Sequence, residues 1–442
     1  MAGKSAREVA LDALTAWQAG GVWSARKLSD AIVKAGLDRR DAALTTYLCS
    51  GVLRNLMLLD YHIARHSSVK LKKMETRVLC ALRLGAFQLL FSDSIPQRAA
   101  VNETVALCRG KNRRVAGFVN AVLRAMTSID DPYEVREKNQ VKRLSILYSH
   151  PEWICRELIE ALGEERAIDV LAANNEAPPV TIQINTLLKD SSAVADTLAE
   201  EGVKVEPHSV VSNCFNLYSS GNIEDLGAYR KGWFWVQDAS SMLAVMALNP
   251  KQGDKILDVC AAPGGKSFAA AVLSGGGAEI TSLDISAPKM ELVREGSDRM
   301  EMKIRTGTAD ATEFIPEYFE RFDMVICDAP CSGLGVIRKK PDIRYVDVER
   351  VAELPKLQSR ILANVAKYLK PGGLILYSTC TWREAENGEV VSRFLEENPN
   401  YSLEGFVLPE PIGEVKAGRY TVWPETLTFD GFFICLMRKN NV

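Results

Sequence analysis

The chain has 442 residues, of which 47% are hydrophobic and 25% charged, and its formal net charge is −2. This length is enough for two or three domains with apolar cores. It has no run of 18 apolar residues, and charges interrupt its first ten positions, so we expect neither a membrane span nor a signal peptide. The ten cysteines follow no pattern of paired spacings, which favours the reducing cytoplasm.

The charge is distributed unevenly along the chain. Residues 1–130 contain 20 Lys and Arg against 10 Asp and Glu, whereas the remainder contains 34 against 46. The first third therefore carries a net charge of +10 and the rest −12. Such a difference predicts a polyanionic partner for the first third.

The first third is also predicted to be helical throughout. Five segments have apolar residues at the i, i+3, i+4 spacing of amphipathic helices. They are residues 7–17, 41–59, 76–91, 101–109 and 116–126.

Two parts of the sequence partly match the patterns of zinc-binding sites. His62 and His66 stand at i and i+4 on a predicted helix, but no Cys or acidic residue lies nearby to complete a zinc site. A plain helix surface is the favoured interpretation of this pair. The P-C-x-x-C signature of zinc deaminases fails because Leu334 replaces its second Cys. We therefore predict no metal site.

Two segments connect the helical third to the rest of the chain. Residues 131–148 open with polar and charged residues and are predicted to be a linker. Residues 149–236 contain a β-like run at 180–185 and a helical pattern near 192–201, which predicts a small α+β subdomain. Near its end, Trp233 and Trp235 could stack on bases or equally well pack in a core.

The segment from Lys255 to Lys266 reads as the first strand and turn of a nucleotide-type α/β fold. Lys255 to Val259 is a short apolar strand, and Ala-Ala-Pro-Gly-Gly-Lys follows Cys260. The G-x-G-x-x-G dinucleotide fingerprint is absent, and Cys260 stands where a P-loop needs Gly. We therefore expect a nucleoside cofactor without a polyphosphate, with a nucleotide-hydrolysing P-loop protein as the weaker alternative.

Three carboxylates follow predicted strands of this region. Asp284 stands 19 residues after Gly265, close to the spacing at which a carboxylate binds ribose hydroxyls in doubly wound folds. Asp310 and Asp328 follow the next two strands. Each could instead cap the helix that follows its strand.

Two of the ten cysteines lie in unusual surroundings. Cys49, Cys80 and Cys108 lie in apolar helical patterns, as is usual for a small buried residue. Cys331 and Cys380 each follow a strand end, among Ser, Thr, Pro and Gly. An exposed thiolate is possible there, and two such residues at one sheet edge could reach the same substrate.

The motifs A-A-P-G-G-K, D-A-P-C-S-G and S-T-C-T, in this order, resemble those of RNA cytosine-C5 methyltransferases that use S-adenosylmethionine (SAM). The resemblance runs from about Trp235 to the end of the chain. It implies that Cys380 is the nucleophile and that Cys331 assists product release. It also agrees with the chemistry, since a thiolate added to C6 of cytosine activates C5. Asp328 could then bind the N3/N4 edge of the base.

The resemblance also implies a SAM site built from the motif turn and the three carboxylates. The residues expected to bind the cofactor are Cys260, Ala261, Ala262, Pro263, Gly264, Gly265, Lys266, Asp284, Asp310 and Asp328.

Several sequence segments in the first third, among them Leu82 to Leu90, resemble segments of the NusB-type RNA-binding domain. Placed before this catalytic core, they resemble bacterial 16S rRNA (cytosine-C5) methyltransferases. The resemblance implies a NusB-like α-helical domain over residues 1–130, the small α+β subdomain, and an α/β Rossmann-like SAM-dependent methyltransferase domain over 237–442. It implies 16S rRNA, free or in an assembling small subunit, as the partner of a monomer. The same chemistry on another rRNA site or on tRNA, and a non-catalytic RNA-binding factor, remain alternatives.

Residues outside the three motifs could also contact RNA. Basic residues after the Cys331 loop could meet RNA phosphates. They are Arg338, Lys339, Lys340 and Arg344. Gln183 stands where the family usually has Arg, so a phosphate contact expected there is in doubt.

Overall fold

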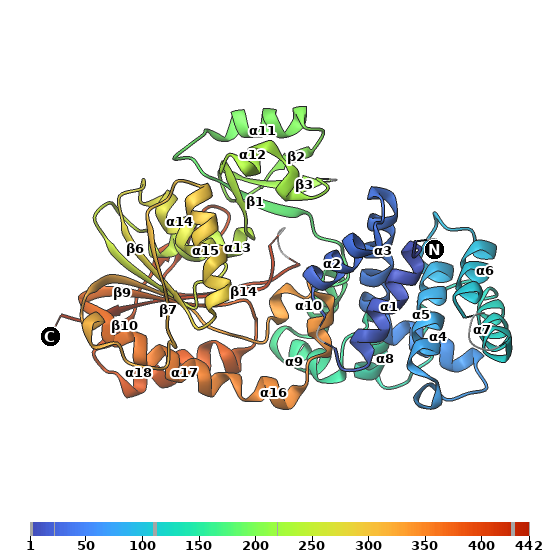
Figure 1. Cartoon of the computed structure of the whole chain (residues 1–442). Helices are drawn as coiled ribbons and strands as arrows, with labels where there is room; N and C mark the ends of the chain where they lie inside the picture. The colour runs from blue at the N-terminus through green and yellow to red at the C-terminus, as the bar shows by residue number, and fades with distance from the viewer. Residues whose placement is uncertain (1–2, 22, 109–112, 219, 426–428, 442) are drawn as a thin grey trace. The chain divides into compact units, whose positions relative to one another are not determined.

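The computed structural model describes residues 3–21, 23–108, 113–218, 220–425 and 429–441. It divides into two compact units. The first comprises residues 1–175 with the segment Lys340–Tyr345, and the second comprises residues 176–339 and 346–442. Figure 1 shows both units, and each is described by itself.

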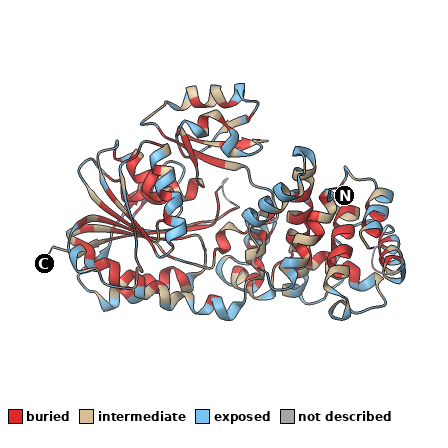
Figure 2. Cartoon of the chain, in the orientation of Figure 1, coloured by how far each residue is buried: buried red, intermediate tan, exposed pale blue. Residues whose placement is uncertain are grey.

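The first unit is built of helices around one apolar core. Its central helix, α5 (Thr76–Phe91), is buried along most of its length (Figure 2). Ser5 and Glu8 form a capping box that begins the first helix, and Asp38 caps the third. The other helices are α1 (Ala6–Gln18), α2 (Ala25–Ala35), α3 (Arg39–Arg54), α4 (Leu56–His66), α6 (Gln97–Cys108), α7 (Arg113–Met126), α8 (Gln140–Tyr148), α9 (Glu152–Leu162) and α10 (Glu164–Ala173).

The structure corrects two predictions for this unit and adds one helix. Residues 41–59 do not form one helix, because α3 ends at Arg54 and α4 begins at Leu56 with a bend of 77°. Helix α2 was not predicted, since only Leu28 of its apolar residues is buried. His62 is not a surface residue: it is buried, with Nε2 2.7 Å from the Pro132 carbonyl oxygen.

Within the described residues, no single helix is long and apolar enough to cross a membrane. The bent pair α3 and α4 passes that test only by length and composition.

The segment Lys340–Tyr345 belongs to the first unit although it follows the Cys331 loop in sequence. Arg344 is fully buried there. Its Nη1 donates to the Asn175 side chain at 2.7 Å and its Nη2 to the Asn174 carbonyl at 3.1 Å. The expectation that Arg344 meets RNA phosphates is therefore wrong, because backbone and amide oxygens bind its guanidinium in a core.

The second unit begins with a small four-stranded antiparallel sheet in the order β2-β3-β1-β4. Helix α11 packs on it through Val194 and Leu198, which confirms an α+β subdomain. The elements are β1 (Val180–Ile184), α11 (Ser191–Glu200), β2 (Lys204–Pro207), β3 (Cys214–Tyr218), α12 (Gly227–Arg230) and β4 (Phe234–Val236).

The rest of this unit is an eight-stranded mixed sheet between helices, as the described residues show it. Strands β5 to β9 pair in parallel in the order β9-β8-β5-β6-β7, and β14 joins β9 antiparallel. The strands are β5 (Lys255–Val259), β6 (Glu279–Asp284), β7 (Ile304–Thr308), β8 (Phe322–Asp328), β9 (Leu369–Thr379), β10 (Tyr401–Leu403), β13 (Arg419–Val422) and β14 (Phe432–Lys439), beside the small pair β11 (Phe406–Val407) and β12 (Glu414–Val415). The helices are α13 (Ala239–Leu248), α14 (Gly265–Leu273), α15 (Ala287–Arg299), α16 (Val348–Ala352), α17 (Leu354–Val365) and α18 (Gly388–Glu397).

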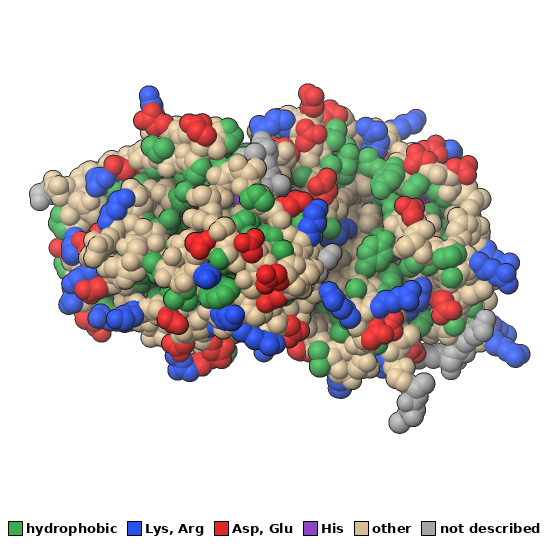
Figure 3. All heavy atoms as spheres, turned by 90° about the horizontal axis from the view of Figure 1, so that it is seen from above, with side chains coloured by type: hydrophobic (Ala, Val, Ile, Leu, Met, Phe, Trp, Pro, Cys, Tyr) green, Lys and Arg blue, Asp and Glu red, His purple; other side chains and the backbone are tan. Residues whose placement is uncertain are grey.

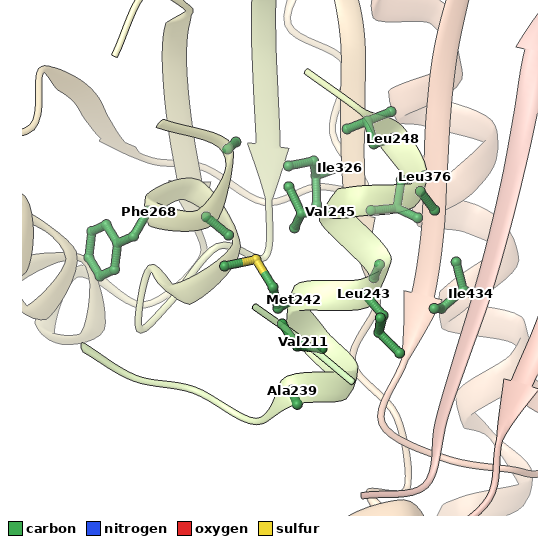
Figure 4. Packing of buried hydrophobic residues seen from close by; sticks show 14 of the residues in the cluster. Val211, Ala239, Met242, Leu243, Val245, Leu248, Phe268, Ile326, Leu376 and Ile434 are labelled. Atoms are coloured by element: carbon green, nitrogen blue, oxygen red, sulfur yellow. The ribbon is translucent and has the colours of Figure 1, made fainter. Parts of the chain in front are cut away.

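Alternate residues of the strands serve two different cores, as the period of two along a strand requires. Ile326 of β8 packs with Met242 and Leu243 of α13 on one face (Figure 4). Its neighbours Val325 and Cys327 pack on the other face, with helices α17 and α18. Strands buried on both faces read as continuous apolar runs, which is why the sequence predicted them well.

The strand order reverses between β5 and β8. From β5 the chain moves outward through β6 and β7, and then returns to place β8 and β9 on the other side of β5. The crevice at the carboxyl ends of strands beside such a switch point is the usual ligand site of an open α/β sheet. The predicted motif residues all lie at this edge.

Candidate active site

The turn after β5 has the shape that its two glycines allow. Gly264 has φ +105°, and a Cβ there would lie 2.5 Å from the Phe268 ring. Gly265 faces Gln237, whose Nε2 would be 3.0 Å from an added Cβ. Backbone conformation and packing therefore require glycine at 264, whereas a side chain at 265 would need Gln237 to shift.

A cavity of about 400 Å³ opens beside this turn, at the ends of β5, β6 and β7. Its walls combine apolar side chains with two carboxylates and two basic groups. Pro330, which directly precedes Cys331, also lines it. The lining residues are Val259, Cys260, Leu283, Asp284, Ile285, Lys289, Ala309, Asp310, Ala311, Thr312, Ile315, Pro330, Leu357, Arg360, Ile361, Val365 and Tyr368.

The two cavity carboxylates are held differently. Asp284 is nearly buried and accepts hydrogen bonds from the backbone N–H groups of Ala262 at 3.3 Å and Ser286 at 2.9 Å. Asp310 accepts the N–H and hydroxyl of Thr312, both at 2.8 Å, and these bonds lower the pKa of its carboxyl. Both carboxylates thus line the cavity with oxygens that could accept hydrogen bonds from the hydroxyl or amino groups of a bound molecule.

Cys260 also lines the cavity, but it is not a reactive thiol. It is largely buried between β5 and the turn, and burial raises its pKa to about 12. The neighbouring carboxylates, Asp284 first among them, contribute to this rise after burial.

Lys266 faces away from the cavity walls toward Asp328. Its Nζ lies 2.6 Å from Asp328 Oδ2, and the Phe432 ring lies 5.0 Å from the same nitrogen. The Ser378 hydroxyl donates to the other Asp328 oxygen at 2.8 Å. Asp328, at the end of β8, is therefore held from two neighbouring elements and keeps about a third of its side chain exposed.

A fourth carboxylate, Asp258, interacts electrostatically with Lys266 and Asp328 and was not predicted. It is fully buried, and the Ser267 hydroxyl donates to it at 2.5 Å. Burial raises the pKa of Asp258 to about 7, although that hydrogen bond opposes the shift. Asp258 is the last residue but one of an apolar strand. Its charge within that apolar run is the only sequence signal that could have marked it as a site residue.

The two cysteines of the motif loops, Cys331 and Cys380, lie next to each other. Cys331 follows β8 and Cys380 follows β9, and their Sγ atoms are 3.1 Å apart. The pKa of Cys331 lies well above its ordinary value, first because it shares a hydrogen bond with Cys380 and then because burial disfavours a thiolate. Two sulfurs this close do not both ionise easily. At most one sulfur of the pair is therefore expected to be a thiolate at a time.

Two polar residues that the sequence did not single out contact these loops. Glu386 and Asn387 are fully buried between β9 and α18. The Ser332 N–H donates to Glu386 at 2.8 Å, and the Thr379 hydroxyl donates to Asn387 at 2.6 Å. They follow the S-T-C-T motif by a few residues, and nothing in the spacing indicates that they turn back toward it.

The structure also corrects the expectation for the basic residues after Cys331. Arg338 is buried and pairs with Asp430 at 2.7 Å, while Lys339 pairs with Asp430 and Asp238. The Asp238 carboxyl is desolvated, but Lys339 still lowers its pKa. These two bases neutralise buried carboxylates, so they are not available for phosphates. Lys340 remains exposed.

The structure also shows the surroundings of the two tryptophans and of Gln183, for which RNA contacts were discussed from the sequence. Trp235 is buried and donates to Gln237 at 2.9 Å, so it is a core residue. Trp233 is partly exposed, and the Lys231 ammonium lies 4.6 Å from its ring centre. Gln183 is fully buried and donates to the Gln237 carbonyl, so its position faces the interior.

Three family models match the chain in the order of these elements. Residues 4–128 match the NusB family, and residues 150–224 match the ferredoxin-like domain of the RsmF/B-like methyltransferases. Residues 245–438 match the 16S rRNA methyltransferase RsmB/F family.

Relatives and solved structures agree with these matches. The chain is 36% identical to the probable ribosomal RNA small subunit methyltransferase B of Bacillus subtilis, over 98% of this chain and 99% of that protein. It is 31% identical to the ribosomal RNA small subunit methyltransferase B of Klebsiella pneumoniae, over 91% of each. The crystal structure of PH0851 has the same fold, with a TM-score of 0.82, 24% identity and 99% of each chain covered. NSun6 from Pyrococcus horikoshii, solved with SFG, shares the fold over 66% of this chain and 99% of its own, with a TM-score of 0.59 and 20% identity. The chain therefore belongs to the RsmB/F family of 16S rRNA methyltransferases and carries a NusB-type helical domain at its N-terminal end.

Proposed function

We propose that this chain transfers a methyl group from SAM to C5 of a cytosine in 16S rRNA, through a covalent bond between Cys380 and C6. One observation carries the proposal. Two cysteines with sulfurs 3.1 Å apart lie at the strand edge that also holds Asp328. A thiolate nucleophile, a second thiol and a carboxylate are the groups that cytosine-C5 chemistry needs.

The cavity beside the turn suits SAM. About 400 Å³ is within the usual range for a small-molecule site, and its apolar walls fit an adenine ring. Asp284 would bind the ribose hydroxyls, and Asp310 would lie toward the adenine. When bound, SAM supplies an electrophilic methyl group.

The first step depends on the cysteine pair. C5 of cytosine is a poor nucleophile until a thiolate adds to C6 and makes C5 enamine-like. Cys331 shares a hydrogen bond with Cys380 and its pKa is raised, which supports Cys380 as the member of the pair that attacks as a thiolate. Cys380 is thus the attacking group. Asp328, oriented by Lys266 and Ser378, would accept from the base N4 edge as charge develops on the ring.

The second step releases the product. After methyl transfer, C5 must lose its proton before the C6–sulfur bond can break. Once Cys380 is bonded to C6, its sulfur no longer disfavours a thiolate at Cys331. Cys331 can then lose its proton to solvent and, as a thiolate, would take the C5 proton while Cys380 leaves as a thiolate. The two cysteines therefore have successive roles, addition by Cys380 and release with the help of Cys331.

Nucleoside analysis tests the activity. The full-length protein is incubated with methyl-labelled SAM and 16S rRNA, and the digested RNA is separated by chromatography. We expect label in 5-methylcytidine, loss of label in Cys380→Ala, and normal labelling in the control Cys108→Ala, which lies in the other unit. Label in a different nucleoside would contradict the proposal. Equal labelling of tRNA would contradict 16S rRNA as the specific substrate.

A further inference from the structure

Two adjacent residues, Glu386 and Asn387, each bind one of the two loops that carry the cysteines. Glu386 ends the short 3-10 helix Glu384–Glu386, and Asn387 precedes α18. Both are fully buried, and both lie outside the cofactor cavity and the strand ends considered so far.

The Glu386 carboxylate binds the Cys331 loop. Its Oε2 accepts the Ser332 N–H at 2.8 Å and the Gln358 side-chain N–H at 3.0 Å. The same Gln358 nitrogen donates to the Pro330 carbonyl at 2.9 Å. The residues on both sides of Cys331 are therefore tied, directly or through Gln358, to one carboxylate oxygen.

The Asn387 carboxamide binds the Cys380 loop in the same manner. Its Oδ1 accepts the Thr379 hydroxyl at 2.6 Å, and its Nδ2 donates to the Thr381 carbonyl at 3.0 Å. These contacts hold the residues on both sides of Cys380. A further bond between the hydroxyls of Ser332 and Thr381, at 3.0 Å, joins the two loops.

We propose that Glu386 and Asn387 are positioning residues that together set the separation of the two cysteine sulfurs. One dipeptide binds one loop with each side chain, so the loops cannot move apart unless a buried hydrogen bond breaks. A catalytic group displaced by about 1 Å can lose a factor of about 100 in rate, so this separation matters for successive use of two thiols. The catalytic consequence rests on the proposed function, but the geometric claim does not.

Oxidative crosslinking measures the geometry without RNA or cofactor. Diamide takes one hydrogen from each thiol and leaves a disulfide, which requires the sulfurs to approach from 3.1 Å to about 2.05 Å. We expect rapid formation of the Cys331–Cys380 disulfide in the full-length protein, identified by peptide mapping. Glu386→Ala and Asn387→Ala should slow it about tenfold or more. Glu389→Ala, at an exposed Glu of the same segment, is the control and should not change it.

Two further variants keep the test decisive. Thr379→Val preserves the side-chain shape but removes the hydroxyl that bonds to Asn387, and it should also slow crosslinking even if an alanine variant fails to fold. Glu386→Gln keeps the length and one acceptor oxygen, so it should crosslink within about twofold of the wild type. Wild-type crosslinking rates in folded Glu386→Ala and Asn387→Ala, or in Thr379→Val, would overturn the proposal.

Methylation kinetics supply the second readout. In the slow-crosslinking variants kcat should fall about 10- to 100-fold while the KM values for SAM and RNA change little. Variants that crosslink slowly but keep the wild-type kcat would contradict the catalytic consequence. A wild-type protein that crosslinks as expected but makes no 5-methylcytidine would contradict the proposed function and leave the geometric claim standing.

Discussion

Lys266 and Asp328 illustrate how a residue of the cofactor turn can serve the substrate side of the site. The sequence motif places Lys266 beside the expected SAM site, but its ammonium bonds to Asp328 at 2.6 Å. The ion pair is shielded, since less than a tenth of the Lys266 side chain is exposed. Its main effect would be to orient Asp328 toward the base.

Lys266→Met should therefore separate catalysis from cofactor binding. Without the ammonium Asp328 loses one of its two partners, and we expect kcat to fall at least tenfold. SAM affinity, measured by calorimetry, should change less than threefold. A large loss of SAM affinity with little change in kcat would assign Lys266 to the cofactor instead.

Asp258 should make stability depend on pH. Its pKa in the folded protein, about 7, exceeds the ordinary value of 3.8, so the folded state binds the proton more tightly. Stability contributed by the protonated form is complete below pH 3.8 and is lost as the pH rises to about 7.

Asp258→Asn removes this titration and keeps an acceptor for Ser267. From pH 5 to 7 the free energy of unfolding of the wild type should fall relative to the variant by about 2 kcal/mol, with little further change above about pH 8. Urea denaturation at each pH measures the difference. A constant difference across this range would contradict a raised pKa.

The basic residues of the loop that follows Cys331 led to a wrong prediction of phosphate contacts. Its run of bases resembles a phosphate-binding loop, yet Arg338 and Lys339 pair with carboxylates from other parts of the fold. A basic side chain's partner cannot be deduced from its neighbours in sequence when that partner lies about a hundred residues away.

Arg338→Met should destabilise the protein by about 3 kcal/mol, because it leaves the buried Asp430 carboxylate short of a partner. The affinity for RNA at fixed salt should stay near the wild-type value in the folded fraction. Lys340→Met is the matched control, since Lys340 is exposed and should not affect stability. Weaker RNA binding by Arg338→Met without lost stability would restore the phosphate interpretation.

Elements with strong local signals were predicted closely. The strand at 255–259 was predicted with its observed limits, because it is a largely apolar run that ends at a turn. The break at Asn55 was not predicted, since neither Gly nor Pro marks it. Glu386 and Asn387 were missed because their roles depend on loops that the fold brings back to them.

At the scale of the whole molecule, the excess of basic residues is confined to the first third of the chain. On the face shown in Figure 3, basic and acidic side chains are interspersed. Lys70, Lys72 and Lys73 of this third are exposed, whereas Arg109 and Lys111, two further bases of the same third, lie outside the described residues.

Replacing Lys70, Lys72 and Lys73 by Gln should weaken RNA binding and flatten its dependence on salt. Each lost phosphate contact lowers the slope of log K against log salt by about 0.7 to 0.9. The control replaces Lys251, Lys303 and Lys416, three exposed lysines in the acidic remainder, with the same change in charge. Equal effects of the two triple variants would show that only net charge matters.

The division of labour between the two cysteines tests the central claim most directly. Wild type, Cys331→Ala, Cys380→Ala and the double variant are incubated with SAM and labelled 16S rRNA, and covalent complexes are separated on a denaturing gel. Cys331→Ala should accumulate protein bound to methylated RNA, because addition proceeds and release is slow. Cys380→Ala and the double variant should give none, since release cannot fail where attachment never occurred. An adduct in Cys380→Ala with none in Cys331→Ala would reverse the roles, and the absence of any adduct would contradict the covalent mechanism.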